Sequence, residues 1–261
     1  LFTVMYASDY VLRKSKQMRT IVKGFLPILG VMICTGALVF VEPDLGALIV
    51  ITAIAMGILF LGGLTLRVIL SLGILAPMGV WGAILISPYK QARIQGFLDP
   101  WSSENVLGSG YQTTQAQMAF GNGEFFGTGV GNSVVKQFFL PEAHTDFIMA
   151  IIGEEFGLLG VTIVLGLFAF LIVRMFGIAK ESIQNNRHFA ALIAQGVAIW
   201  FSIQCTINIA VNLGLFPTKG LTLPLLSFGG SSILVSIIAI AIVLRIDHEN
   251  RRNIRGQHYN K

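Results

Sequence analysis

The sequence contains little charge and few cysteines, and each shortage excludes a class of protein. Only 12% of its 261 residues are charged, whereas 54% are hydrophobic and the mean hydropathy is +0.74. A soluble domain needs about twice this share of charged residues to cover its surface. The two cysteines, Cys34 and Cys205, both lie in apolar runs, so the sequence has neither a disulfide framework nor a cysteine-based metal motif. The composition therefore indicates an integral membrane protein.

Six apolar runs approach the length of a membrane span, which needs about 20 mostly apolar residues to cross a hydrocarbon core about 30 Å thick. We expect spans over residues 25–41, 45–63, 66–86, 147–173, 189–213 and 227–244. Residues 1–12 resemble the last turns of another span. The predicted fold is all-α, a polytopic transmembrane helix bundle that forms a single domain over residues 1–261. Because the chain begins with neither Met nor a complete span, we expect it to be the later part of a longer protein.

Basic residues orient this predicted bundle, since Lys and Arg are enriched in the cytoplasmic loops of membrane proteins. Threading the six spans alternately leaves four of the 18 basic residues on one side, namely Lys90, Arg93, Lys136 and Lys219, and 14 on the other. The second side, with the carboxyl terminus, is therefore predicted to be cytoplasmic. The net charge of +5 reflects this topology and does not indicate nucleic-acid binding.

Residues 87–146 form the predicted large external loop, and long ordered loops usually carry function. We expect residues 97–101 to be an amphipathic anchor with Trp101 at the membrane interface. Residues 110–120 are predicted to form a short helix with a glutamine-rich face. The loop is thus expected to contain ordered structure.

Five glycines lie in residues 121–133 of this loop and allow three interpretations. A phosphate-binding loop is disfavoured, because neither a preceding strand nor a Gly-Lys-Ser/Thr ending is present. Tight turning among packed helices is favoured. In the third interpretation, backbone amides of the loop and Lys136 hold a diphosphate outside the membrane.

Asp146 stands where the polar loop enters an apolar run, and an ionisable group at that depth is costly unless it is used. Helix capping alone would explain an acidic residue here, but it does not explain the nearby Glu142, His144 and Glu154. On an ideal helix Glu154 lies about 80° from Asp146, so we expect these two carboxylates to share a cavity. Glu155 lies on the opposite face and is expected to meet a different neighbour.

Other polar positions are weaker candidates. Gln204, Asn208 and Asn212 recur every four residues and form one stripe, for which interhelical hydrogen bonding is the favoured explanation. His144 is either a proton shuttle or an ordinary loop residue. Glu42 either lines the same external pocket or borders a tight turn at Pro43.

Residues 223–232 interrupt an apolar stretch. Within a membrane, such irregular backbone is tolerated only where it is buried in protein or lines a cavity. These residues are also part of a specific pattern formed by several segments. The pattern consists of residues 97–101, 110–112, 129–133, 136, 140–148, 153–155 and 224–232. It resembles the SEDS family of shape, elongation, division and sporulation proteins over essentially the whole chain. Residues 132–136 and 214–224 are more similar to the division members than to the elongation members. Phe228 stands where a Tyr is commoner in the family.

The resemblance implies a peptidoglycan glycosyltransferase that polymerises glycan strands from lipid II outside the cytoplasmic membrane, with about ten spans when complete. It implies that Asp146 corresponds to the essential aspartate of the family's external loop. It also implies a class B penicillin-binding transpeptidase and other cell-division proteins as partners. The first spans, and an external Trp-containing loop of the family, are absent from this sequence.

The chemistry of that reaction requires a base and a positive charge. A sugar 4-hydroxyl attacks an anomeric carbon as undecaprenyl diphosphate leaves, with Asp146 as the expected general base. External cations, with or without a divalent ion such as Mg²⁺ or Mn²⁺, are expected to neutralise the leaving group. The expected substrate-binding residues are Lys136, Arg93, Lys90, Glu42, His144 and Glu154.

Two other functions remain open. A flippase or transporter of the lipid-linked precursor would also need polar cavities and helices interrupted by Gly and Pro, but near the middle of the bilayer. A scaffold would use its polar residues only to pack helices. The position of the main polar cluster at the external boundary favours the enzyme.

Overall fold

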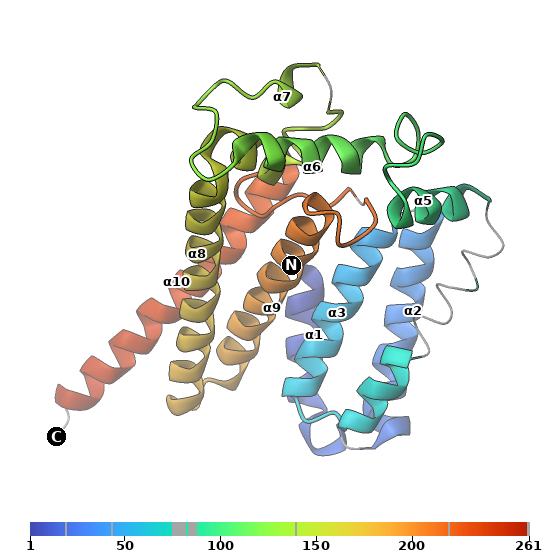
Figure 1. Cartoon of the computed structure of the whole chain (residues 1–261). Coiled ribbons are helices and arrows are strands. Elements are labelled where there is room, and N and C mark those ends of the chain that lie inside the picture. The colour runs from blue at the N-terminus through green and yellow to red at the C-terminus, as the bar shows by residue number, and fades with distance from the viewer. Residues whose placement is uncertain are drawn as a thin grey trace. The chain divides into compact units, whose positions relative to one another are not determined.

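The computed structural model describes residues 1–18, 20–42, 44–74, 82, 88–138, 140–218 and 220–259, and within these residues every regular element is a helix. The helices are α1 (Phe2–Arg13), α2 (Leu26–Val41), α3 (Leu45–Leu61), α5 (Pro88–Leu98), α6 (Tyr111–Gly123), α7 (Val135–Phe138), α8 (Ile148–Gln184), α9 (His188–Asn212) and α10 (Gly230–Tyr259), with a short 3₁₀-helix η1 (Ser15–Gln17) and a π-helix η2 (Ile21–Phe25) (Figure 1). Residues 66–74 are also helical. The predicted all-α class is confirmed.

Within the described residues, four helical segments are long and apolar enough to cross a membrane, judged by length and composition. They are Val22–Val39, Ile148–Gln184, His188–Asn212 and Gly230–Asn253. The predicted span over residues 45–63 is a shorter apolar helix, Gly46–Leu61. Most of the span predicted over residues 66–86 lies outside the described residues. Helices that are apolar around their whole circumference, as α2 and α3 are, suit a lipid environment.

The contacts divide the chain into two compact units. The first unit comprises Leu1–Ser71, Ala169–Ile203 and Ser231–Lys261, and the second comprises Leu72–Phe168 and Gln204–Gly230. In the first unit α9 packs closely on its neighbours at Gly196, where a Cβ would collide with side chains of Val4 in α1 and Ile58 in α3. Val4 and Ile58 are completely buried. Apolar residues such as Leu38, with 69% of its surface exposed, face outward.

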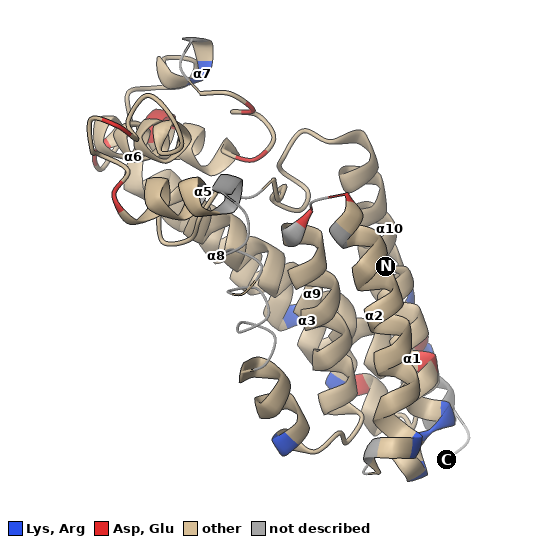
Figure 2. Cartoon of the chain, turned by 90° about the vertical axis from the view of Figure 1, so that its right-hand side faces the viewer, with Lys and Arg blue, Asp and Glu red and all other residues tan. Residues whose placement is uncertain are grey.

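Basic residues are separated from the acidic Glu42 and Asp44 along the first unit (Figure 2). The basic residues cluster near the end of α1, together with acidic partners such as Asp9, whereas Glu42 and Asp44 lie where α2 ends and α3 begins. Asp44 caps α3 there, because its Oδ1 accepts a hydrogen bond of 2.9 Å from the amide of Ala47. The separation agrees with the charge pattern of the sequence, and the cytoplasmic position of the basic end stays a prediction.

In the second unit, α6 lies across the first turns of α8 (Figure 1). Small side chains allow this approach: Ala116 and Ala119 of α6 and Ala150 of α8 are completely buried in one apolar cluster. The helix predicted over residues 110–120 is confirmed as α6. Trp101 is 55% exposed, and its indole Nε1 donates a 3.0 Å hydrogen bond to Gln117 on α6. This contact ties the predicted anchor segment to the glutamine-rich helix.

Candidate functional site

Asp146 lies in the turn that leads into α8, two residues before the helix begins at Ile148. Asp146 is partly exposed, and its backbone amide donates a 3.1 Å hydrogen bond to the carbonyl of Glu142. A Cβ added to Gly220, an exposed residue, would stand 3.4 Å from Oδ2 of Asp146. The partly exposed Asp146 therefore lies close to the backbone of Gly220, a residue without a side chain.

Two buried amides of α9 fix the backbone of Asp146. Nδ2 of Asn208 and Nδ2 of Asn212 donate to the Asp146 carbonyl at 3.0 and 2.9 Å. Asn208 and Asn212 are 1% and 0% exposed. Oδ1 of Asn212 also accepts from the amide of Ala150 in the first turn of α8, at 3.0 Å. The asparagines therefore connect α9 to the loop and to the start of α8 at once.

The same stripe of α9 holds a second segment of chain. Nδ2 of Asn208 donates to the carbonyl of Leu221 at 2.6 Å, and Nε2 of Gln204 donates to the carbonyl of Thr222 at 2.7 Å. The favoured prediction for this stripe was hydrogen bonding between helices, and Asn212 makes such a bond with Ala150 of α8. In addition, Gln204 and Asn208 bind irregular backbone, and Asn208 and Asn212 position Asp146. Polar residues at a spacing of four were visible in the sequence, but their backbone partners were not.

Residues 223–232 pack against the Asp146 loop, as expected for irregular backbone buried in protein. The amide of Phe228 donates to the carbonyl of His144 at 2.9 Å. Ser227 is 1% exposed, and its Oγ accepts from the amide of Leu223 at 2.7 Å. Three segments distant in sequence therefore meet around Asp146, one before α8, one in α9 and one before α10.

The glycine-rich loop completes a break in α8. Gly157 has a φ of 65° and a ψ of −162°, which interrupts the helical hydrogen bonds. Four backbone hydrogen bonds from the loop replace them: Thr128 to Glu154 (2.9 Å), Gly129 to Glu155 (3.1 Å), Leu158 to Glu124 (3.0 Å) and Leu159 to Phe125 (3.2 Å), each written from amide to carbonyl. A Cβ on Gly123 would collide with the carbonyl of Gly153. The packing interpretation of the glycines is therefore supported, and the described residues contain no strand for a phosphate-binding loop.

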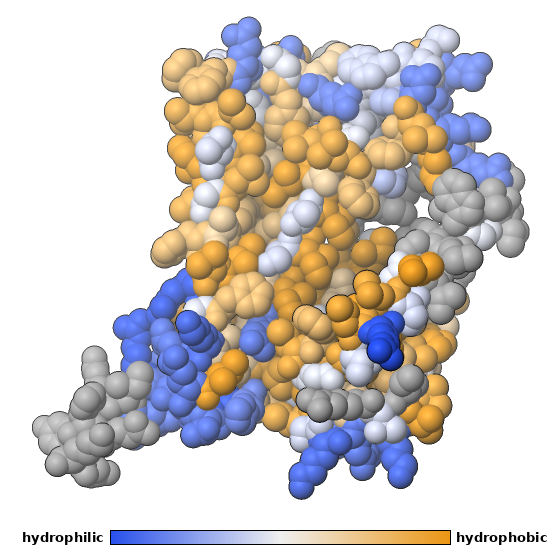
Figure 3. All heavy atoms as spheres, turned by 60° about the horizontal axis from the view of Figure 1, so that its bottom comes forward, coloured by the Kyte–Doolittle hydropathy of each residue, from blue (hydrophilic) through white to orange (hydrophobic). Residues whose placement is uncertain are grey.

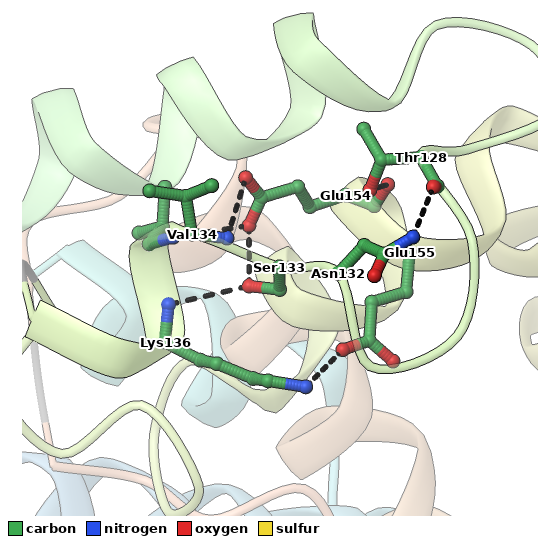
Figure 4. A network of polar contacts seen from close by, with 8 residues as sticks. Thr128, Asn132, Ser133, Val134, Lys136, Glu154 and Glu155 are labelled. Atoms are coloured by element: carbon green, nitrogen blue, oxygen red, sulfur yellow. Dashed lines mark hydrogen bonds and ion pairs between the residues drawn. The ribbon is translucent and has the colours of Figure 1, made fainter.

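Glu154 and Glu155 anchor the following part of the loop (Figure 4). Glu154 is 1% exposed. Its carboxylate accepts from the hydroxyl of Ser133 and from the amides of Val134 (3.3 Å) and Val135 (3.4 Å). The ammonium of Lys136 forms an ion pair with Glu155, and these side chains are 21% and 9% exposed. The expectation that the two glutamates meet different neighbours is confirmed.

One expectation about this region is wrong. Asp146 and Glu154 do not share an open cavity, because the Glu154 carboxylate is buried and already accepts three protein donors. Glu154 is therefore not placed to bind a substrate. Two of the loop amides, those of Thr128 and Gly129, donate to α8, and binding of a diphosphate by other amides of the loop stays a prediction. Sequence spacing gave the angle between two side chains, but not the loop that would cover one of them.

The other predicted site residues are distributed as follows. His144 is exposed and immediately precedes the Thr145–Asp146 turn. Glu42 is exposed at the end of α2 in the first unit. Lys90 and Arg93 belong to α5, but their side chains fall outside the described part of the structure. Within the described residues no group of three or more His, Cys, Asp or Glu side chains could hold a metal ion.

The first comparison with known proteins concerns curated sequences. A relative from Aromatoleum aromaticum, named "Probable peptidoglycan glycosyltransferase FtsW", is 50% identical over 256 residues, covering 98% of this chain and 62% of the relative. A relative of the same name from Thiomonas intermedia is 47% identical over 259 residues, covering 99% and 63%. The chain thus spans less than two thirds of the length of these relatives.

Solved structures are similar as well. One, described as "Structural coordination of polymerization and crosslinking by a peptidoglycan synthase complex", matches with a TM-score of 0.71 and 27% identity, over 95% of this chain and 70% of that chain. The rod shape determining protein RodA of Thermus thermophilus matches in fold, with a TM-score of 0.60 and 23% identity, over 95% and 65%.

The family comparison covers nearly all of the sequence. The model of the FtsW, RodA and SpoVE family, described as cell cycle proteins, matches residues 1–252. This family is the one that the motifs around Asp146 resembled. With several membrane-spanning helices and relatives named FtsW at 47 to 50% identity, the chain is a multi-pass membrane protein that belongs to the FtsW/RodA/SpoVE family of cell cycle proteins.

Proposed function

We propose that this protein is a peptidoglycan glycosyltransferase that polymerises glycan strands from lipid II during cell division. The names of the curated relatives support this activity, as does the similarity to a chain of a peptidoglycan synthase complex. The proposal concerns the whole protein, since this chain spans 62% and 63% of the two relatives.

One observation carries the assignment of Asp146 as the general base: its residue is partly exposed beside Gly220, while its backbone is held by two buried asparagines. A catalytic base must be both reachable and fixed in position. The carboxylate of Asp146 takes the proton of the attacking 4-hydroxyl, and the hydroxyl oxygen forms a bond to the anomeric carbon. The bond from that carbon to the diphosphate oxygen breaks, and the diphosphate leaves with the electron pair. This single displacement converts an α-linked donor into a β linkage.

The leaving diphosphate needs positive charge, and Lys136, Lys90 and Arg93 are the proposed sources. Lys136 is paired with Glu155, so it would carry a net positive charge to the substrate only if a phosphate displaced this partner. Lys90 and Arg93 lie on α5 in the same unit as Asp146. A divalent ion has no cluster of three ligands among the described residues, and no step is assigned to one.

Two further substrate contacts are part of the proposal. His144 is exposed next to the Asp146 turn and would contact a saccharide. Glu42, the second of these residues, is exposed at the end of α2, and its contact with the substrate is proposed from the sequence alone. Glu154 would act through the loop that it anchors, because its carboxylate is buried.

The proposed location is the bacterial inner membrane, with the basic end and the carboxyl terminus in the cytoplasm and Asp146 facing the periplasm. The charge separation in Figure 2 supports this orientation for the first unit. The proposed partners are a class B penicillin-binding transpeptidase and other cell-division proteins, in line with the polymerising and crosslinking complex to which the chain is similar.

Reconstitution with lipid II tests the proposal. Asp146→Asn keeps the shape of the side chain and removes the base, so we expect folded protein without polymer. Asp44→Asn is the matched control, since it changes an aspartate before another helix and Asn also caps helices. Unchanged polymerisation by Asp146→Asn would remove Asp146 as the base. Movement of lipid II between leaflets without polymer, in the wild type, would favour a flippase instead.

A further inference from the structure

An apolar groove lies between the start of α9 and the middle of α10, within the first unit. Its volume is about 460 Å³, within the range of roughly 300–1,000 Å³ common for small-molecule sites. Phe189, Ala190 and Ile193 line it from α9, and Ile238, Ala241 and Ile242 line it from α10. Ile246 of α10 and two arginines, Arg187 and Arg245, complete the lining.

The two arginines share a single carboxylate. Arg187 forms an ion pair with Glu249, whose other oxygen accepts from Nε of Arg245 at 2.8 Å. Two guanidinium groups against one carboxylate leave one positive charge. By contrast, Arg174 in the same unit contacts two carboxylates, those of Asp247 and Glu181, at 2.9 and 3.4 Å. The arginine end of the groove therefore has charge available for an anion.

The position of the groove indicates what kind of anion fits. Its α10 lining falls within Gly230–Asn253, a segment apolar enough to cross a membrane. Figure 3 shows hydrophobic surface giving way to hydrophilic residues toward the carboxyl-terminal end of the chain. The arginines therefore lie at the depth of lipid headgroups and the apolar lining at the depth of acyl chains. A free phosphate would use the arginines alone, whereas a phospholipid would use both parts.

We propose that this groove binds one anionic phospholipid from the leaflet at the basic end of the protein. The phosphate would lie between Arg187 and Arg245, and an acyl chain would lie between α9 and α10. Both neutral and anionic lipids offer acyl chains, so charge provides the selectivity. This site lies in the first unit and is separate from Asp146 in the second. It is therefore independent of the proposed polymerase chemistry.

Lipid retention by the purified full-length protein tests this inference. The protein is reconstituted in nanodiscs of phosphatidylcholine with a minor share of phosphatidylglycerol, released into detergent, and its bound lipids are counted by native mass spectrometry. We expect roughly fivefold enrichment of phosphatidylglycerol over its share in the nanodisc, because the one net positive charge of the arginine pair attracts an anionic headgroup at the membrane surface. In Arg187→Gln/Arg245→Gln the enrichment should disappear. Arg251→Gln is the matched control, because Arg251 is a 59% exposed basic residue of α10 that does not line the groove.

A second pair of variants tests the groove without changing charge. Ala241→Trp places an indole in the groove from an exposed position, so the fold should tolerate it, and it should reduce lipid retention at least fivefold. Leu244→Trp is its control, since Leu244 is 60% exposed on the same helix and does not line the groove. Retention of phosphatidylglycerol by the wild type only in proportion to its share in the nanodisc would overturn the proposal. Equal retention by Ala241→Trp and Leu244→Trp would overturn it as well.

Discussion

Asn212→Ala is the most direct test of how Asp146 is positioned. Asn212 is completely buried, and its side chain makes three close contacts with backbone: to the carbonyl of Asp146 (2.9 Å), to the carbonyl of Asn208 (2.9 Å) and from the amide of Ala150 (3.0 Å). Side-chain hydrogen bonds within membranes contribute about 0.6 kcal/mol each on average. Their loss should therefore lower the free energy of unfolding by about 2 kcal/mol.

The effect on catalysis should exceed the effect on substrate binding. Without Asn212, the Asp146 carbonyl keeps the amide of Asn208 at 3.0 Å as a donor, so the turn is loosened but not released. A misplaced base raises the barrier, and about 1.4 kcal/mol corresponds to a tenfold slower reaction. We expect kcat for polymerisation of lipid II to fall about tenfold. KM should change little, because a completely buried side chain cannot contact the substrate.

Ser182→Ala provides the control, since Ser182 is a completely buried hydrogen-bonded residue in the first unit. Thermal unfolding and the dependence of rate on lipid II concentration would be measured for both variants. A wild-type kcat in folded Asn212→Ala would refute the positioning role. So would an equal fall of kcat in Ser182→Ala, because the loss would then follow general destabilisation.

Three further predictions concern the loop and the topology. Lys136→Met should destabilise the protein by about 3 kcal/mol, because it removes the cation paired with the largely buried Glu155 carboxylate; adding Glu155→Gln should recover most of the thermal stability, and an equally unstable double variant would argue against the pair. Gly123→Ala should abolish folded protein in size-exclusion chromatography, because its Cβ would collide with the Gly153 carbonyl, and a normal elution profile would contradict that packing. A cysteine at Glu42, in a protein without its two native cysteines, should react with an impermeant maleimide in spheroplasts, and labelling only after permeabilisation would reverse the proposed orientation.

Much of the helical architecture followed from hydrophobicity alone. The spans predicted over residues 147–173 and 189–213 correspond to α8 and α9, with the start of each within one residue. Asp146 was also identified from the sequence, because an acidic residue between a polar loop and an apolar run is conspicuous. These features are local, so they depend on residues adjacent in the chain.

The features that were missed depend on contacts between distant segments. The break in α8 at Gly157 is stabilised by the backbone of residues 124–129, which carries no signal in residues 148–184. Asn208 and Asn212 were recognised as a polar stripe, yet their acceptor, the Asp146 carbonyl, lies more than 60 residues away. The pairing of Lys136 with Glu155 was missed for the same reason, because the two residues are distant in the sequence. The sequence shows which polar side chains are present, whereas the partners of these side chains are known only from the folded structure.

The break in α8 has a consequence for how this region can vary. Two backbone segments, residues 124–129 and residues 154–159, are joined by four hydrogen bonds in a fixed register. Most substitutions of side chains in the segment leave those bonds intact. A single inserted or deleted residue would shift every donor against its acceptor at once. Homologous chains should therefore tolerate changes of residue type in this segment more readily than changes in its length.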